Sequence, residues 1–407
     1  IRSSPNRPLS PPLAVGFALR KFSVNPSAYG ELRGKAWASA DWNGSSPIML
    51  IGVGGAGSQI AHGVSRAFGE PMRLILCDTD SVSARDNTRF ILLGGNRLSG
   101  RGSGGDVAQA RLAAEDSKHE FNVHLEGVRL AVIVTSLGGG TGGGASLEII
   151  KHLRHLGIPS IIFATLPFSF EGEEKSRRAQ GITSMLEEVA GASIFTPLDQ
   201  LIDNVDNMDE AMRRAVDTIA TGVTLFWRML EKPGYIRLDA ERIKKIIAVA
   251  GRGKFATISA QGATRANDII DGFKRSTLLA SSNSVKSILL GVLAGEDLRL
   301  SEVGSIADGV RETFAPHASF DIATVNDESI FSGRISAVLM LFEANKVKTN
   351  LDEPISLTNQ KRRKRDLSPL SQGPQGRGRF TNVEPTIYNG EDLDVPTFSR
   401  RNITLDI

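Results

Sequence analysis

The sequence predicts an α/β protein in which a doubly wound parallel sheet precedes a long central helix and a smaller α+β second domain, with disordered tails. Two observations carry this prediction. From Pro47 onward, continuous apolar runs of the kind found in buried parallel strands alternate with amphipathic helical segments. Beyond residue 232, four further strand-like runs alternate with two helical segments.

The first domain, 46–206, is defined by apolar runs with the composition of strands buried on both faces. These runs are PIMLIGV (47–53), RLILCD (73–78), LAVIVTSL (130–137), SIIFATLP (160–167) and ASIFT (192–196). Helical periodicity lies between them, near 56–68, 106–118, 143–156 and 173–190. This alternation predicts βαβ units and therefore a parallel sheet.

A long amphipathic segment, 207–232, follows, and Pro233 and Gly234 end it. Its length is typical of a central helix that leads to another domain. The second domain, 233–345, contains the strand-like runs KFATISAQG, VKSILLGVLAG, SFDIATVND and RISAVLMLFEA. TRANDIIDGFKR and LSEVGSIADGVRETFA read as helices between them, so we expect a smaller sheet with helices on one face.

Both ends of the chain differ in composition from the two domains. Residues 1–45 are rich in proline and serine and contain no acid before Glu31, which predicts a disordered extension, with an organelle transit peptide as the alternative. Residues 346–390 are polar, lack apolar periodicity and include the basic run KRRKR, so we expect a disordered linker. Apolar residues return in 391–407, which is typical of a segment that orders on binding a partner.

Bulk composition bounds the class of protein. The 407 residues are 41% hydrophobic and 23% charged, as in ordinary globular proteins. Cys77 is the single cysteine, so no intramolecular disulfide can form. No apolar run approaches the roughly 20 residues that span a bilayer. The net charge of +3 is too small to indicate nucleic-acid binding, and we expect none.

Glycine-rich loops carry the functional signal. GGGTGGG, 138–144, lies between a buried strand and a helix, where backbone N–H groups converge on an anion. A second loop has Gly52, Gly54 and Gly57 in the spacing G-x-G-x-x-G, and Asp78 stands at the end of the next strand. Because this is the dinucleotide-binding fingerprint, an NAD-dependent oxidoreductase is an alternative.

A third loop, SGRGSGGD, contains Gly104 and Gly105 and precedes another helix. Three phosphate cradles at the carboxyl edge of one sheet fit a triphosphate better than the single pyrophosphate of a dinucleotide. The sequence contains no G-x-x-x-x-G-K-[ST] motif, which excludes a P-loop NTPase.

Together these motifs resemble the nucleotide loops of the tubulin/FtsZ family, and its FtsZ branch fits best. GGGTGGG is similar to the family signature, while IGVGGAGSQ, CDTDS, GRGSGGD and LPFSFEGEEK resemble the first, second, third and fifth loops. Order and spacing follow the family from about Pro47 to Ala344, and DLDVPTF near the end is similar to the FtsZ terminal peptide.

The resemblance implies a GTPase that binds GTP or GDP, with Mg²⁺ accompanying the nucleotide and no metal site of the protein's own. It implies phosphate contacts from the glycine loops, a ribose contact from Glu171, and acceptance of the guanine N–H groups by Asp209. Lys175 stands where the family usually has an arginine. The implied nucleotide-binding residues are Gly54, Gly55, Ala56, Gly57, Asp78, Gly104, Gly105, Gly138, Gly139, Gly140, Thr141, Gly142, Gly143, Glu171, Lys175 and Asp209.

Two departures from the family pattern matter. Leu198 stands where an asparagine usually touches the purine. In the loop that the next subunit inserts over the phosphates, the family usually reads Asn-x-Asp-x-x-Asp, whereas this chain has Arg237, Asp239 and Arg242, with Glu241 one position away. The expected catalytic residues are therefore Asp239, Glu241 and Arg242, and we expect slow hydrolysis of GTP.

The resemblance also implies partners. The chain is expected to polymerise head to tail with itself and to form division-ring filaments in the cytoplasm at the division site. Asp392–Arg401, with Leu393, Val395 and Phe398 as apolar anchors, is expected to bind membrane-tethering division proteins. A hydrolysis-poor scaffold polymer of the same family is the first alternative, and the oxidoreductase is the second.

Overall fold

The chain separates into two units, Ile1–Pro354 and Ile355–Ile407. Among the described residues, the first unit holds a ten-stranded sheet and eleven helices, and the second holds a two-stranded hairpin. The computed structural model describes residues 46–83, 89–202, 207–232, 234–238, 240–280, 284–344, 387–388 and 391–392.

The first unit is organised around one mixed sheet with the strand order β3-β2-β1-β4-β5-β6-β7-β10-β8-β9. Neighbouring strands are parallel except where β10 pairs with β7 and β8. The strands are β1 (Ile48–Val53), β2 (Leu74–Asp78), β3 (Phe90–Leu92), β4 (Leu130–Ser136), β5 (Ser160–Leu166), β6 (Ala192–Pro197), β7 (Ala250–Gln261), β8 (Val285–Ala294), β9 (Ser319–Asn326) and β10 (Arg334–Ala344). The order 3-2-1-4-5-6 is that of a doubly wound fold, whose switch point lies between β1 and β4.

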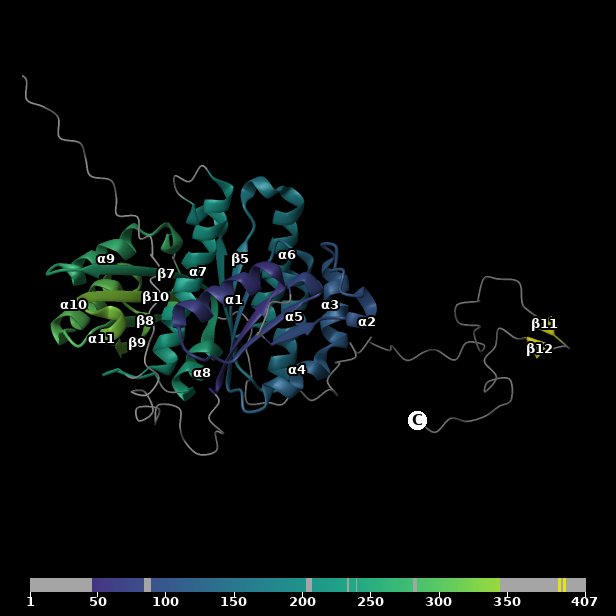
Figure 1. Cartoon of the computed structure of the whole chain (residues 1–407), viewed down its shortest axis with the longest axis horizontal. Coiled ribbons are helices and arrows are strands. Elements are labelled where there is room, and N and C mark those ends of the chain that lie inside the picture. The colour runs from purple at the N-terminus through teal and green to yellow at the C-terminus, as the bar shows by residue number, and fades with distance from the viewer. Residues whose placement is uncertain are drawn as a thin grey trace, which may run out of the picture. The chain divides into compact units, whose positions relative to one another are not determined.

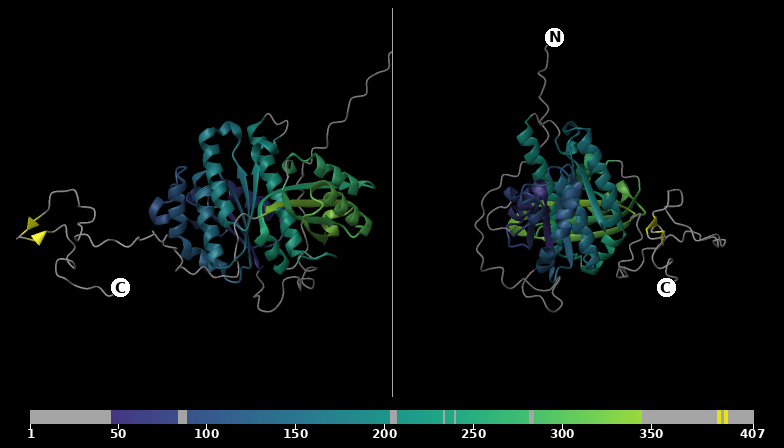
Figure 2. Two further views of the ribbon diagram at one scale, coloured as in Figure 1. Left: turned by 180° about the vertical axis from the view of Figure 1, so that it is seen from behind. Right: turned by 90° about the vertical axis from the view of Figure 1, so that its right-hand side faces the viewer.

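Helices cover both faces of this sheet (Figures 1 and 2). Helices α1, α7 and α8 share an apolar core with one face, and α3 to α6 share another with the opposite face. The helices are α1 (Gly54–Phe68), α2 (Gly95–Leu98), α3 (Val107–Asp116), α4 (Lys118–Leu125), α5 (Gly140–His155), α6 (Glu173–Val189), α7 (Met208–Glu231), α8 (Ala240–Val249), α9 (Arg265–Arg275), α10 (Leu300–Phe314) and α11 (Glu328–Phe331). Short 3-10 turns are η2 (Ser81–Ser83), η3 (Ser169–Glu171), η4 (Leu198–Leu201) and η5 (Thr277–Leu279).

Helix α7 joins the two halves of the first unit (Figure 1). The Asn207 side chain caps the start of α7 by accepting hydrogen bonds from the N–H groups of Asp209 and Glu210. Because Gly63 of α1 has no side chain, Ala220 of α7 can approach α1 closely. A methyl added to Gly63 would lie 3.0 Å from the Cβ atom of Ala220. Near the far end, Arg228 donates to the carbonyl oxygens of Ala67 and Phe68, which close α1. With 24 residues, α7 is about 36 Å long, and it packs on β7, β8, β9 and β10.

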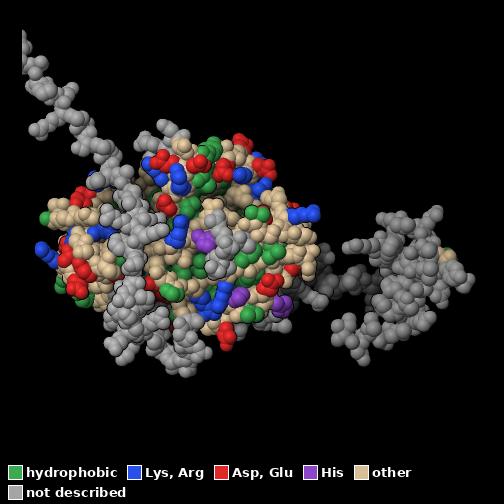
Figure 3. Space-filling view, in the orientation of Figure 1, with side chains coloured by type: hydrophobic (Ala, Val, Ile, Leu, Met, Phe, Trp, Pro, Cys, Tyr) green, Lys and Arg blue, Asp and Glu red, His purple; other side chains and the backbone are tan. Residues whose placement is uncertain are grey.

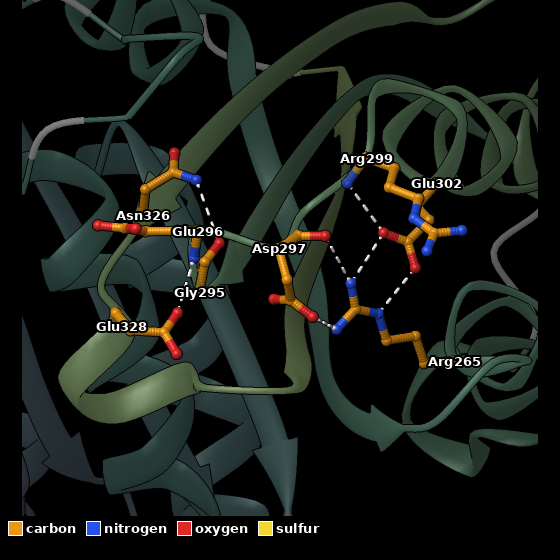
Figure 4. A network of polar contacts seen from close by, with 8 residues as sticks. All are labelled: Arg265, Gly295, Glu296, Asp297, Arg299, Glu302, Asn326 and Glu328. Carbon is orange, nitrogen blue, oxygen red and sulfur yellow. Dashed lines mark hydrogen bonds and ion pairs between the residues drawn. The ribbon is translucent and has the colours of Figure 1, made fainter.

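A buried arginine fixes the loops of the second half (Figure 4). Arg265, at the start of α9, is 6% exposed and donates to Glu302 at 2.7 and 2.9 Å and to the Asp297 carboxylate at 2.6 Å. The hydrogen bonds that Arg265 donates to Glu302 raise the pKa of Arg265, so the guanidinium stays charged. The Glu328 carboxylate, at the start of α11, accepts a hydrogen bond from the N–H of Glu296, which neighbours Asp297. This contact ties the start of α11 to the loop that Arg265 holds.

The second unit is described only at its hairpin, in which β11 (Ile387–Tyr388) pairs antiparallel with β12 (Glu391–Asp392). The tails 1–45 and 346–390 and the peptide Asp392–Arg401 otherwise lie outside the described residues. On the face of the chain in Figure 3, acidic and basic side chains are interspersed. Within the described ranges, no helix is both long and apolar enough to cross a membrane.

The predicted fold class is confirmed, with one difference in how the second half is built. Its strands continue the first sheet, because β7 pairs in parallel with β6 through Ser193–Arg252 and Ile194–Gly253. The helix α8 was not predicted, although Ile243, Ile246 and Ile247 are spaced for one apolar helix face and are buried.

Candidate functional site

Four loops meet at the carboxyl edge of the parallel strands, beside the switch point. Strands β1 and β4 pair along their whole length, from Ile48–Leu130 to Val53–Thr135. Helix α1 begins at Gly54, immediately after β1, and α5 begins at Gly140, shortly after β4. Both helices therefore start two or three residues earlier than the sequence predicts, inside the glycine loops. Ligands of doubly wound folds bind at this place.

The structure brings the predicted glycine loops into direct contact. A methyl on Gly54 would lie 3.2 Å from the backbone nitrogen of Gly142, so the first loop touches the longest one. The Thr141 hydroxyl forms a 2.7 Å hydrogen bond with the hydroxyl of Thr79, which follows β2. A methyl on Gly140 would lie 2.6 Å from the carbonyl carbon of Gly105, which belongs to the third loop. Thr79 was not predicted as a site residue, although it stands inside the CDTDS motif.

The glycines of these loops have two different roles. Four of them have no room for a side chain because backbone or helix neighbours fill the space: Gly57, Gly140, Gly142 and Gly144. A methyl on Gly142, for example, would lie 2.0 Å from the carbonyl oxygen of Ser136. Gly139 and Gly104 instead have no described atom within 4 Å of an added methyl, so they face open space. The first group packs the loops together, and the second is available to a ligand.

The starts of α1 and α5 are suited to an anion. Val53 and Gly139 occupy the two N-cap positions and have no side chain that can accept a hydrogen bond. Neither first turn contains an acidic residue. The positive ends of the two helix dipoles and their N–H groups therefore meet beside the same strands. Helix α3 differs, because Asp106 accepts from the N–H groups of Ala108 and Gln109 and caps it. The third loop thus contributes open backbone at Gly104, not a helix end.

The Asp78 carboxylate organises the loop after β2. Its Oδ1 accepts from the N–H of Thr79 at 2.7 Å, and its Oδ2 accepts from the hydroxyl of Ser83 at 2.5 Å. The residue is 4% exposed, and a methyl on Gly55 would lie 3.9 Å from Oδ2. Asp78 therefore lies beside the first glycine loop, but its oxygens are used within its own loop. A dinucleotide fold would instead direct this acid at a ribose hydroxyl.

The loops after β5 and β6 form the next part of the edge. Glu171 accepts from the N–H of Phe168 at 2.9 Å and pairs with Lys175 at 2.8 Å. These two predicted residues thus lie together, and Lys175 holds the carboxylate of Glu171. Leu198, which replaces the expected asparagine, is 7% exposed and packs against Phe168 and Ala215. The departure at Leu198 therefore fills an apolar cluster that joins η3, η4 and α7.

Asp209 lies in the first turn of α7, next to this cluster in the chain, and is exposed. Its N–H donates to the Asn207 side chain at 2.9 Å, which fixes the backbone at the helix start. The structure contains no nucleotide, so its contact with guanine stays a prediction.

The loop that departs from the family pattern, 237–242, lies at the amino edge of the parallel strands, opposite the glycine loops. Asp239 is outside the described residues. Glu241 is exposed in the first turn of α8, and Arg242 Nε donates to Asp321 Oδ1 on β9. Helix α8 reaches the amino end of β6, because a methyl on Gly191 would lie 2.5 Å from Ile247. Within one chain, the described part of this loop and the glycine loops are therefore separated by the length of the parallel strands.

Known proteins decide which nucleotide fold this is. Residues 47–206 match the family model described as Tubulin/FtsZ family, GTPase domain. Over these residues the chain is similar to the GTPase domain of the tubulin/FtsZ family. The resemblance predicted from the glycine motifs is thus confirmed, and the G-x-G-x-x-G segment lies within the matched residues.

Relatives extend the match beyond that domain. The chain is 27% identical over 361 residues to the cell division protein FtsZ of Pseudomonas aeruginosa, covering 87% of this chain and 88% of that protein. The fold is similar to that of an empty FtsZ dimer from M. jannaschii, with a TM-score of 0.67 and 20% identity over 74% of this chain and 93% of the other. It is also similar to a GTPγS-bound protofilament of CetZ2 from Haloferax volcanii, with a TM-score of 0.63 and 21% identity over 74% and 94% of the two chains.

Proposed function

We propose that this chain is an FtsZ-type GTPase that polymerises head to tail into division filaments and completes its active site at the subunit contact. The observation that carries the proposal is the placement of two predicted groups at opposite edges of one sheet. The nucleotide loops follow β1, β2, β3, β4 and β5, whereas Glu241 and Arg242 lie near the amino ends of β6 and β9. Stacking identical chains would bring the second group of one subunit over the first group of the next.

The nucleotide loops support a triphosphate in particular ways. The open N–H groups at the starts of α1 and α5 would bind phosphate oxygens, and Gly104 and Gly139 would allow them close approach. Among the described residues, no group of three acidic, histidine or cysteine side chains could hold a metal ion. In this proposal Mg²⁺ accompanies the nucleotide and offsets the charge of its phosphates.

The test combines two measurements on the purified full chain with GTP or GDP. Light scattering reports filaments, and phosphate release reports hydrolysis. We expect both to rise with GTP above a threshold protein concentration, because the active site needs two subunits. Phosphate release that is simply proportional to protein concentration, without filaments, would contradict a site shared between subunits.

A scaffold polymer with little hydrolysis is a second candidate, and one observation favours it. Arg237 and Arg242 stand where the family usually has polar or acidic groups, which leaves fewer carboxylates to orient water. Filaments that form with GTP and release no phosphate would support this candidate.

We predict that Asp209→Ala weakens GTP binding about tenfold, because a guanine N–H group would lose its acceptor. Asp217→Ala is the matched comparison, since Asp217 is also an exposed aspartate of α7. The measurement is competition between GTP and a fluorescent guanine nucleotide on the unassembled chain. If Asp209→Ala keeps the parent affinity and Asp217→Ala weakens binding, the guanine contact is made by Asp217, two turns further along α7.

We predict that deletion of 391–407 leaves GTP-dependent assembly unchanged and abolishes localisation to the division site. The deleted segment carries the apolar anchors Leu393, Val395 and Phe398, and the sheet of the first unit ends at Ala344. Fluorescence microscopy of cells that express only the truncated chain gives the result. Division rings of normal appearance in those cells would show that the peptide is dispensable.

A further inference from the structure

The segment between α7 and α8 is held against β9 at two places. At the first, the N–H of Ile236 donates to the hydroxyl of Thr324 at 2.9 Å, and the N–H of Thr324 donates to the carbonyl oxygen of Ile236 at 2.9 Å. Gly234 makes this approach possible, because a methyl there would lie 1.7 Å from the Thr324 carbonyl oxygen. The backbone before Asp239 is therefore fixed to Thr324, a buried residue of the edge strand β9.

The second place lies just after Asp239 in the chain. Arg242 Nε donates to Asp321 Oδ1, and the Asp321 side chain is only 9% exposed. Alternation along β9 puts Asp321 on the same face as Ala323 and Val325, which belong to the core that α8 shares. A carboxylate at the edge of an apolar core is costly to bury unless a cation is paired with it. Arg242 supplies that cation.

We infer that Arg242 is a positioning residue, which acts through Asp321 to fix the start of α8 and with it the loop that carries Asp239 and Glu241. The basic residue that breaks the family pattern at 242 is paired with an acid 79 positions later, on β9. This inference rests on the proposed function of the loop. It differs from a contact between Arg242 and the next subunit's phosphates, because the partner of Arg242 lies in its own chain.

The test is a mutant cycle of the pair with neutral side chains: Arg242→Gln, Asp321→Asn and both together. Lys245→Gln is the matched control, since it removes one exposed positive charge from the same helix. Three measurements are made on each full chain: GTP binding before assembly, phosphate release per assembled subunit, and hydrogen exchange at the Ile236 and Thr324 amides.

We expect Arg242→Gln to slow phosphate release about tenfold, since a displaced loop misplaces its carboxylates, and to speed exchange at both amides. GTP binding before assembly should keep its parent value, because the glycine loops lie at the other edge of the sheet. The double variant should recover most of the lost rate, as no unpaired buried carboxylate remains. Lys245→Gln should match the parent in all three measurements.

The inference is overturned by an Arg242→Gln chain that behaves like Lys245→Gln, or by a double variant no better than Arg242→Gln alone. Loss of phosphate release in Arg242→Gln with parent-like amide exchange also overturns it, because that result places Arg242 in direct contact with the reacting phosphate. If the parent itself releases no phosphate, the proposed GTPase function fails. The amide exchange then still decides whether the pair positions the loop.

Discussion

Gly142→Ala is expected to destabilise the nucleotide-free chain by about 3 kcal/mol, because the added methyl cannot be accommodated without moving the backbone. It would lie 2.0 Å from the Ser136 carbonyl oxygen and 2.9 Å from the Thr135 hydroxyl. That hydroxyl donates to the carbonyl oxygens of Val53 and Gly142, so the change would separate β1 from the start of α5. Urea unfolding without nucleotide measures the effect.

Gly139→Ala is the matched comparison, one loop position outside the packed group. Gly139 is exposed, its φ of −96° suits any residue, and no described atom lies within 4 Å of an added methyl. We expect its stability to change by less than about 0.5 kcal/mol, while GTP affinity falls about tenfold because the methyl enters the phosphate cradle. Gly181→Ala, on the exposed face of α6, controls for the general gain in helix propensity.

These variants separate packing from ligand contact. A Gly142→Ala chain as stable as Gly181→Ala would mean that the loop does not approach Ser136 as the structure shows. Parent-like GTP affinity in Gly139→Ala would remove Gly139 from the phosphate site.

The glycine loops show how far the sequence alone reaches. Strand, loop and helix follow one another within about 30 residues, so local pattern was enough to place the loops at one sheet edge. The division of labour among the glycines was not predictable, because Gly140 is crowded by Ser103 and Asp106 from a different loop. Only the folded chain shows that Gly140 packs while Gly139, its neighbour, stays open.

The two departures from the family pattern were seen in the sequence, but their physical meaning depends on distant partners. Leu198 reads as a lost polar contact until Phe168 and Ala215 are found around it. Arg242 reads as a cation aimed at phosphate until Asp321 is found beside it, 79 residues away in the chain. Contacts between residues so far apart in the chain produce no local sequence pattern, so the sequence alone cannot assign the partners.

Asp239→Ala is expected to slow phosphate release per assembled subunit by about 10²-fold or more, the contribution typical of a positioned general base. In this chain Asp239 is the acid that stays in register with the family motif. Arg242 donates to Asp321 of its own chain. We propose that Asp239 and Glu241 orient water at the next subunit's γ-phosphate. Filaments should still form, because GTP binding depends on loops at the other edge of the sheet.

Glu241→Ala is the control that assigns the role to one carboxylate. Glu241 is exposed in the first turn of α8, where its charge also favours the positive end of the helix dipole. We expect it to slow phosphate release less than Asp239→Ala does, because it stands one position out of register. Sedimentation of filaments and phosphate release are measured in the same samples, so the rate is expressed per assembled subunit.

The order of the two rates decides the mechanism of this loop. If Asp239→Ala releases phosphate at the parent rate and Glu241→Ala does not, Glu241 is the base and the shifted motif has a shifted catalytic residue. If neither change alters the rate, water is oriented by groups of the nucleotide-bearing subunit itself. In that case the loop serves assembly alone, and the substitutions at 237 and 242 carry no catalytic penalty.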